Sequence, residues 1–149
     1  MYVGVRRFTV EWGDCDPSGI VFNPRYFEWF DAATAGSYAD VGISKEELHK
    51  RFEYMGMPMV ETRARFLRPS TWGDQLVLET RLCDFKRSSF RVEHRLLKEG
   101  ELVVEGFETR VWVAADPADP TKVKSRPIPP DLIEIFMSGP DRRQSGSPA

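Results

Sequence analysis

One long apolar helix followed by four strand-like segments is the pattern that most constrains the fold of this chain. Aromatic residues and alanines recur near helical spacing over residues 24–40, where Asn23 and Pro24 are typical of an N-cap and a helix start. The segments that follow cover residues 57–68, 74–85, 88–98 and 101–114. This order predicts an α+β fold in which the helix covers one face of a mostly antiparallel sheet.

Shorter signals complete the expected elements. Residues 5–12 alternate apolar and polar side chains, which predicts a fifth, half-buried strand. Ser44 and Glu47 have the spacing of a capping box, so a short second helix is expected to start at Ser44. Between the last two segments, Glu99 and Gly100 predict a tight hairpin turn.

The C-terminal part of the chain has weaker patterns. Prolines without any periodicity predict a loop over residues 116–130, and residues 131–137 predict a short last helix. Small, polar and charged residues from position 138 onward predict a frayed end. We therefore expect one domain over residues 1–137 and a flexible C-terminal tail over residues 138–149.

Charge and composition argue against several classes of protein. The 149 residues include 21 Lys and Arg against 23 Asp and Glu, whereas nucleic-acid-binding domains usually carry a basic excess. No apolar run approaches the ~20 residues that span a membrane, and no signal peptide is visible. Two Cys and two His offer little for a zinc site or a disulfide framework. We expect a cytoplasmic protein with no metal site and neither a nucleic-acid nor a membrane partner.

The main candidate catalytic residues lie between the first predicted strand and the long helix. Residues 13–24 read GDCDPSGIVFNP, so Asp14 and Asp16 stand just before a helix N-terminus. Unpaired N–H groups at such an end can hold a developing oxyanion, and a carboxylate can act as nucleophile or as general base toward water. The residues alone leave open the alternative of a plain turn, in which an Asp side chain accepts bonds from nearby backbone.

This segment resembles the 4-hydroxybenzoyl-CoA thioesterase family of hotdog-fold proteins. The motif D-x-D-P-x-G-I-V at residues 14–21 precedes an aromatic-rich helix, and the likeness returns at residues 29–33, 56–60 and 87–90. It covers most of residues 7–115. The resemblance implies the hotdog fold, in which a five-stranded antiparallel sheet wraps a long central helix, and this agrees with the α+β pattern above.

The resemblance also implies an acyl-CoA thioesterase that releases free acid and CoA. Asp16 matches the catalytic carboxylate, as nucleophile or as base, and the backbone N–H of Asn23 matches the group that polarises the thioester carbonyl. Asp31 matches a helix carboxylate near the acyl pocket, with a solvated helix charge as the alternative. The other residues expected to bind the acyl group are Phe22, Met57 and Pro58.

CoA recognition is expected at a basic segment. The run Lys86, Arg87, Ser88, Ser89 combines cations with hydroxyls suited to phosphate oxygens, and it matches the nucleotide-contacting segment of the family. The alternative is a solvated hairpin end. The resemblance further implies a homo-oligomer, a dimer or a homotetramer, with the active site between subunits and no cofactor beyond the CoA of the substrate.

Two departures from the family shape the expected substrate. Many short-chain acyl-CoA thioesterases of this fold carry a His around the position of Asn23, so Asn favours the aryl-CoA branch. Met57 stands where the hydroxybenzoyl enzyme has a smaller polar residue, which favours a larger or more apolar acyl group. We therefore expect hydrolysis of an aromatic or medium-sized acyl-CoA. The alternatives are a short-chain acyl-CoA thioesterase, a hotdog hydratase or dehydratase, and a non-catalytic acyl-CoA-binding subunit.

Overall fold

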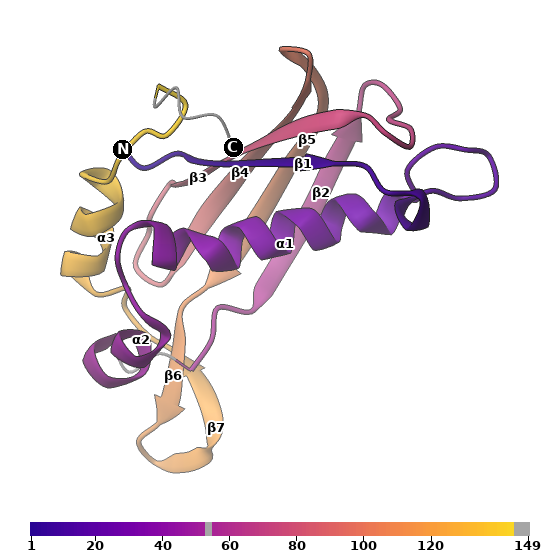
Figure 1. Cartoon of the computed structure of the whole chain (residues 1–149). Helices are drawn as coiled ribbons and strands as arrows, with labels where there is room; N and C mark the ends of the chain where they lie inside the picture. Colours follow the sequence, from indigo (N-terminus) through magenta and orange to yellow (C-terminus); the bar gives the residue numbers. More distant parts are fainter. Residues whose placement is uncertain (53–54, 145–149) are drawn as a thin grey trace.

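A five-stranded antiparallel sheet curves around one long helix, α1 (Asn23–Asp40), in the computed structural model, which describes residues 1–52 and 55–144 (Figure 1). The strand order is β1-β3-β4-β5-β2, and every neighbouring pair is antiparallel. The strands are β1 (Gly4–Thr9), β2 (Met59–Phe66), β3 (Gln75–Cys83), β4 (Ser89–Lys98) and β5 (Glu101–Val111). The predicted α+β hotdog fold is confirmed.

Smaller elements flank this sheet. They are η1 (Trp12–Asp14), α2 (Lys45–Phe52), β6 (Val113–Asp116), β7 (Asp119–Ser125) and α3 (Pro130–Met137). The loop predicted over residues 116–130 is wrong in part, because β6 and β7 pair as a separate two-stranded hairpin. Nearly all of β7 is exposed, so its residues carry no apolar alternation from which a strand could be predicted.

The middle of α1 packs directly on the sheet. Phe30 is buried and faces Gly106 on β5, where an added Cβ would lie 2.5 Å from Phe30 Cε2. The glycine therefore allows the ring to approach the strand closely. The core under α1 consists of Val10, Val21, Tyr26, Phe30, Ala33, Leu76, Leu78, Leu96, Val103 and Val104.

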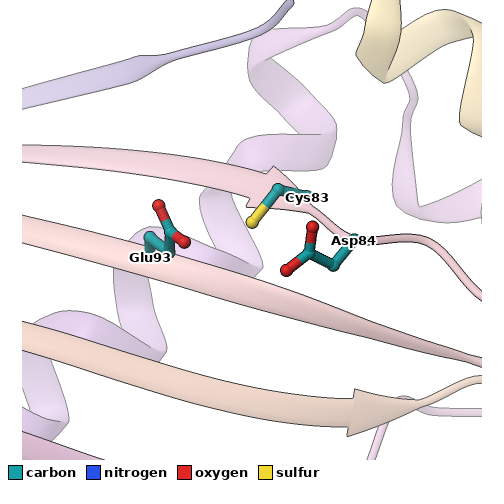
Figure 2. Close-up of side chains that lie close together, drawn as sticks. All are labelled: Cys83, Asp84 and Glu93. Atoms are coloured by element: carbon teal, nitrogen blue, oxygen red, sulfur yellow. The ribbon is translucent and has the colours of Figure 1, made fainter.

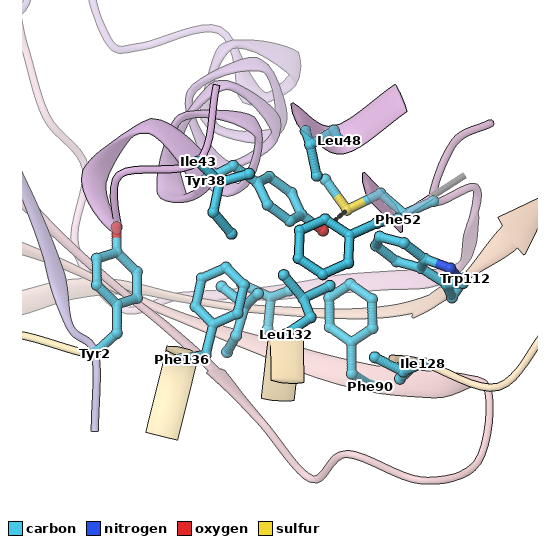
Figure 3. Packing of buried hydrophobic residues seen from close by; sticks show 13 residues of the cluster. Tyr2, Tyr38, Ile43, Leu48, Phe52, Phe90, Trp112, Ile128, Leu132 and Phe136 are labelled. Carbon is cyan, nitrogen blue, oxygen red and sulfur yellow. Dashed lines mark hydrogen bonds between the residues drawn. The ribbon is translucent and has the colours of Figure 1, made fainter. Parts of the chain in front are cut away.

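A second core lies at the C-terminal end of α1, where α2 and α3 close over the sheet (Figure 3). Aromatic rings dominate this core, and Phe136 of α3 packs edge-on against both Tyr2 and Tyr38. Met57 also belongs to it, and the Tyr38 hydroxyl donates to Met57 Sδ at 3.0 Å. The segment before β2 is therefore fixed against α1.

Two local signals from the sequence are confirmed and one is shifted. Ser44 Oγ accepts from the N–H of Glu47 at 3.1 Å, and Glu47 Oε2 accepts from the N–H of Ser44 at 3.0 Å, which completes the capping box of α2. Glu99 and Gly100 have φ angles of 52° and 79°, as their tight turn requires. The predicted N-cap at Asn23 is wrong by one residue, because Phe22 is the N-cap and Asn23 is the first residue of α1.

The C-terminal segment also differs from the predicted tail. Val3 donates its N–H to the carbonyl oxygen of Pro140 at 3.0 Å, and its own carbonyl accepts from the N–H of Arg142 at 2.9 Å. Residues 138–144 therefore lie along the start of the chain, and residues 145–149 lie outside the described residues. Among the described helices, none has the length and apolar character needed to cross a bilayer.

Candidate active site

A short irregular hairpin connects η1 to α1 and carries the acidic motif. The N–H of Phe22 donates to the carbonyl of Asp14 at 2.8 Å, and the N–H of Asp16 donates to the carbonyl of Ile20 at 2.9 Å. Gly19 closes the turn with a φ of 85°, a conformation that glycine adopts without strain. Asp16 therefore stands at the turn of this hairpin, and Asn23 stands where its second arm enters α1.

The Asp16 carboxylate is half-buried and is held by one of its two oxygens. Oδ1 accepts from the N–H of Ser18 at 2.8 Å and also from the Ser18 hydroxyl. Oδ2 accepts no hydrogen bond from the part of the chain that the structure describes. The turn predicted as the alternative is thus present, and it fixes the carboxylate while leaving one oxygen open.

Both carboxylate oxygens of Asp14 face other groups of the protein. Its Oδ2 accepts from the N–H of Glu11 at 2.9 Å, and its Oδ1 lies 3.9 Å from Arg25 Nε. Arg25 in turn donates from Nη2 to the carbonyl of Gly13 at 3.3 Å. The structure therefore separates the two acids, and Asp16 is the carboxylate with a free oxygen.

The backbone N–H of Asn23 is available at the start of α1. As the first residue of α1, Asn23 has no acceptor within the helix for its N–H, and this N–H donates to no described residue. The dipole of the helix adds partial positive charge at this end. The adjacent Phe22 side chain is 52% exposed, so it borders an open surface.

Asp31 lies farther along α1 and is paired with a residue that the sequence analysis did not consider. Arg110 on β5 donates from Nη2 to Asp31 Oδ1 at 2.7 Å and to Glu108 Oε1 at 2.8 Å. Arg110 and Glu108 are buried, whereas 63% of the Asp31 side chain is exposed. Asp31 is therefore not a solitary solvated helix charge.

Glu108 is the centre of a buried polar network. Its Oε2 accepts from the Thr34 hydroxyl at 2.6 Å and lies 2.9 Å from His94 Nε2, while His94 Nδ1 lies 2.9 Å from Thr80 Oγ1. Burial by itself would raise the pKa of Glu108, but the His94, Thr34 and Arg110 contacts lower this pKa to about 2. Both ring nitrogens of His94 thus have partners in the core. The inward positions of Glu108 and Arg110 on a strand were the signal that could have revealed the network.

Met57 and Pro58, the two predicted acyl-binding residues before β2, differ in how far they are buried. The Met57 side chain is 8% exposed and belongs to the core, while its carbonyl oxygen accepts from Arg110 Nη1 at 3.2 Å. Pro58 is exposed, and its carbonyl accepts from the N–H of Val111 at 3.1 Å. Within one chain, Met57 therefore borders the site through its backbone rather than its side chain.

The predicted CoA-binding segment forms the loop between β3 and β4. Its backbone is fixed, since the carbonyls of Arg87 and Ser88 accept from the N–H groups of Ile128 and Trp112, both at 2.7 Å. The side chains of Lys86 and Arg87 are exposed, and those of Ser88 and Ser89 are partly buried. The Thr9 end of β1 pairs with Gln75 at the start of β3, so the loop after β1, which carries Asp16, and the loop after β3 lie at opposite ends of the sheet (Figure 1). A nine-residue strand such as β3 is about 30 Å long. One chain does not bring the two segments together.

A thiol and two carboxylates meet at the end of β3. Figure 2 shows Cys83, Asp84 and Glu93, whose potential ligand atoms lie within 4.8 Å of one another. Glu93 is paired with Arg81, and Asp84 lies 3.4 Å from Arg91. Burial, with the nearby Glu93 charge, raises the pKa of the Cys83 thiol to about 11. Because both acids already have arginine partners and the thiol stays protonated, we assign no metal to this cluster.

Comparison with known proteins identifies the family. The sequence model of the thioesterase-like superfamily matches residues 10–136. The chain belongs to this superfamily. Its enzyme class is that of a thioester hydrolase, which confirms the predicted resemblance.

Two relatives are named as hydrolases of aromatic CoA thioesters. The chain is 30% identical to 4-hydroxybenzoyl-CoA thioesterase of Pseudomonas sp. (strain CBS-3), over 85% of this chain and 92% of that protein. It is also 30% identical to 1,4-dihydroxy-2-naphthoyl-CoA hydrolase of Synechococcus sp. (strain WH7803), over 86% of this chain and 84% of that protein.

Solved structures agree with these relatives. A variant of 4-hydroxybenzoyl-CoA thioesterase in complex with 4-hydroxybenzoyl-CoA superposes with a TM-score of 0.79 at 28% identity, covering 90% of this chain and 98% of that one. A gentisyl-coenzyme A thioesterase superposes with a TM-score of 0.73 at 32% identity, covering 91% of this chain and 100% of that one.

Proposed function

We propose that this protein hydrolyses aromatic acyl-CoA thioesters, with Asp16 as the catalytic carboxylate and the Asn23 N–H as the oxyanion donor. One observation carries the proposal. The hairpin carries the Asp16 carboxylate, which has one open oxygen, and leads into α1, whose first N–H, that of Asn23, donates to no described residue. A carboxylate can attack the thioester or activate water, and a helix N–H can stabilise the oxyanion that forms, so the two groups together suit thioester hydrolysis.

The spacing along the hairpin suits a thioester between these groups. Asp16 is opposite Ile20 and Phe22 is opposite Asp14, so Asp16 and Asn23 are about three residues apart along the hairpin, on the order of 10 Å. An N–H···O contact of ~2.9 Å, a C=O bond of ~1.2 Å and an approach of ~3 Å to the carbonyl carbon sum to roughly 7 Å. The length of the Asp16 side chain accounts for the rest of the spacing between the two residues.

Two routes are open to the Asp16 carboxylate. Direct attack would expel CoA as a thiolate and leave a mixed anhydride, which water then hydrolyses. As a general base, Asp16 would instead take a proton from the water that attacks. A thiol has a pKa of about 8.5 and leaves readily, so neither route needs a strong acid for the leaving group. Neither route needs a cofactor, and we propose none beyond the CoA of the substrate.

The substrates of the relatives support an aromatic acyl group. Their names specify 4-hydroxybenzoyl-CoA, 1,4-dihydroxy-2-naphthoyl-CoA and gentisyl-CoA. All three are ring acids with at least one hydroxyl group. We therefore favour a hydroxylated aromatic acyl-CoA over a short-chain one, and we propose that Phe22, Asp31 and the segment of Met57 and Pro58 border the acyl group.

The edge strand β2 supports a homodimer. β2 is the last strand of the sheet, and Val60 and Phe66 on it are 66% and 46% exposed. An edge with exposed apolar side chains is prone to pair with another chain. Trp12 and Trp72, whose rings lie 5.6 Å apart, add exposed apolar surface near the Asp16 hairpin. We propose that two chains pair antiparallel through β2 and that such dimers can associate into tetramers.

Such a dimer would reunite the separated parts of the site. β2 runs from Met59 to Phe66, and in Figure 1 it runs from the end of the sheet near α2 to the end near the loop between β1 and α1. Antiparallel pairing of two β2 strands puts the Phe66 end of one chain beside the Met59 end of the other. Asp16 of one protomer would then lie on the same side of the dimer as the segment of Met57 and the loop of Lys86 in the other protomer.

Basic side chains near the loop between β3 and β4 support CoA binding there. Lys86 and Arg87 are exposed beside Ser88 and Ser89. Arg51 and Arg126 line a pocket of about 350 Å³. The chain just after Arg126 is joined to this loop, because the N–H of Ile128 donates to the carbonyl of Arg87. We propose that these cations hold the phosphates of CoA. The two free thiols, Cys15 and Cys83, support a reducing compartment, so we propose the cytoplasm.

The direct test is thiol release from a panel of CoA esters. The panel comprises benzoyl-, 4-hydroxybenzoyl-, 1,4-dihydroxy-2-naphthoyl-, phenylacetyl-, acetyl- and hexanoyl-CoA. We expect the wild-type chain to release CoA from the aromatic esters with a kcat/KM at least about 10-fold above that for acetyl- and hexanoyl-CoA. Faster release from the short-chain esters would contradict the substrate class. Binding of the aromatic esters without release would contradict the enzyme.

A further inference from the structure

Arg25 of α1 contacts the first arm of the Asp16 hairpin, which comprises residues 13–16. Its Nη2 donates to the carbonyl of Gly13 at 3.3 Å, and its Nε lies 3.9 Å from Asp14 Oδ1. Among the described residues, no other side chain of α1 donates a hydrogen bond to this arm. The arm that carries Asp16 is therefore joined to the body of the helix through Arg25.

The second arm of the hairpin, which ends at Phe22, is held by other contacts. The N–H of Val21 donates to the carbonyl of Ser70 at 2.9 Å, and Phe22 is the N-cap of α1. This arm is thus covalently continuous with the helix that carries the Asn23 N–H. The position of Asp16 relative to that N–H therefore depends on how the first arm is held, by its backbone bonds to the second arm and by the arginine.

Helix stability does not explain a cation at this position. Arg25 is the third residue of α1, and the partial positive charge at a helix N-terminus disfavours a cation in the first turn. Its Nε is also buried without a hydrogen-bond partner among the described residues, which costs free energy. Its pair with Glu28, at 3.0 Å between Nη1 and Oε2, is partly exposed and contributes little. The side chain is better explained by the hairpin that it contacts.

Hydrolysis by Asp16 would be sensitive to a small shift of the first arm. The carboxylate must reach the carbonyl carbon, or a water beside it, while the Asn23 N–H holds the carbonyl oxygen. A displacement of about 1 Å in such an arrangement can cost about 100-fold in rate. The contacts proposed for CoA belong to a different loop, so a shift of Asp16 should lower kcat and leave KM nearly unchanged.

We propose that Arg25 is a positioning residue that holds the first arm of the hairpin on α1 and so sets the place of the Asp16 carboxylate relative to the Asn23 N–H. This inference rests on the proposed thioesterase function and adds the residue that orients its catalytic carboxylate. Arg25 acts only through Asp16. Its loss should therefore slow the chemical step, and it should have no effect once the Asp16 carboxylate is absent.

The test measures kcat and KM on the best aromatic ester of the panel for Arg25→Met, Arg25→Lys and the matched control Glu28→Gln. Methionine keeps an apolar stem but loses every donor, whereas lysine keeps one donor group for the Gly13 carbonyl. Glu28→Gln removes the ion pair within α1 and leaves the contacts of Arg25 with the hairpin. Arg25→Met is also measured in an Asp16→Asn background.

We expect Arg25→Met to lower kcat by at least about 10-fold, with a KM within about threefold of the wild type. Arg25→Lys should recover kcat to within about fivefold of the wild type. Glu28→Gln should keep kcat within about twofold. In the Asp16→Asn background, Arg25→Met should change the residual kcat by less than about twofold, because the carboxylate that it orients is no longer present.

Three results would overturn the inference. The first is an Arg25→Met variant whose kcat stays within about threefold of the wild type. The second is an equally large loss of kcat in the Asp16→Asn background, since Arg25 would then act independently of Asp16. The third is a Glu28→Gln variant that loses as much kcat as Arg25→Met.

Two further outcomes are kept apart from these. If Arg25→Met does not fold, Arg25→Gln is measured in the same way, because the glutamine amide nitrogen ends at the position of Arg25 Nε, short of Gly13. Each variant is compared with the wild type by chemical unfolding, so that a loss of folded protein is not read as a loss of kcat. A wild type that hydrolyses no ester of the panel would instead contradict the proposed function, so the two failures are distinguishable.

Discussion

His94 Nε2 lies 2.9 Å from Glu108 Oε2 in the interior of the protein, where both side chains are almost wholly buried. Burial disfavours the charged carboxylate, but hydrogen bonds from this histidine, from Thr34 and from Arg110 outweigh it. They lower the pKa of Glu108 from its ordinary value of 4.5 to about 2. A carboxylate held in this way links the stability of the fold to pH.

Glu108 should therefore stabilise the protein above pH 4.5, and this contribution should be lost as the pH falls from 4.5 toward 2. Glu108→Gln should lower the free energy of unfolding by about 3–5 kcal/mol near pH 7, because it leaves Arg110 with one buried partner fewer. The difference from the wild type should shrink as the pH approaches 2. Urea unfolding at several pH values measures it.

The exposed pair of Arg68 and Glu101 provides the control for that series. Glu101→Gln should change the free energy of unfolding by less than about 1 kcal/mol, since both side chains are more than half exposed. A Glu108→Gln variant as stable as the wild type near neutral pH would show that the network contributes no stability.

Gly106→Ala tests the close approach of α1 to the sheet. An added Cβ would meet Phe30 at 2.5 Å, so the ring must move and its stack on His94 must change. We expect a loss of about 1–3 kcal/mol in the free energy of unfolding, measured by chemical unfolding. Gly13→Ala, where nothing lies within 4 Å of the added Cβ, should change it by no more than about 0.5 kcal/mol. Equal effects would contradict this packing.

A site shared between protomers predicts complementation between two defective chains. Asp16→Asn removes the catalytic carboxylate, and a Lys86→Ala/Arg87→Ala chain lacks the cations proposed for CoA. In a mixed dimer, one of the two sites receives both defects, and the other receives a native Asp16 and a native basic loop. Mixing the two chains under subunit exchange should therefore restore thiol release well above that of either variant alone.

The same mixture has a distinct outcome if each chain contains a whole site. Every site would then carry one defect, and mixing would give only the average of the two activities. The state of association is measured in parallel by size-exclusion chromatography, so that a lack of recovery is not confused with a lack of exchange.

Local patterns gave much of this fold correctly. Ser44 and Glu47 form the predicted capping box, and Glu99 with Gly100 forms the predicted turn. These signals depend on residues close in the sequence, so tertiary contacts do not alter them. The order of one long helix and its strands sufficed for the α+β class, and the D-x-D-P-x-G-I-V motif sufficed for the family.

Features that depend on distant contacts were harder to predict. Glu108 and Arg110 are charged, and charged residues on a strand are normally expected to face solvent. Only their pairing with Asp31, His94 and Thr34, all distant in sequence, makes them core residues. Met57 was predicted to bind the acyl group, which remains a prediction; its contact with Tyr38, 19 positions earlier, could not be read from the sequence.

The most direct test of the account compares two neighbouring carboxylates. Asp16 has an open oxygen, whereas the two oxygens of Asp14 face the Glu11 N–H and the Arg25 side chain. On the best aromatic ester of the panel, Asp16→Asn should lower kcat by at least about 100-fold while the ester still binds, and Asp14→Asn should lower it by less than about 10-fold. Asp16→Asn activity within about threefold of the wild type would contradict the assignment of Asp16 as the catalytic carboxylate.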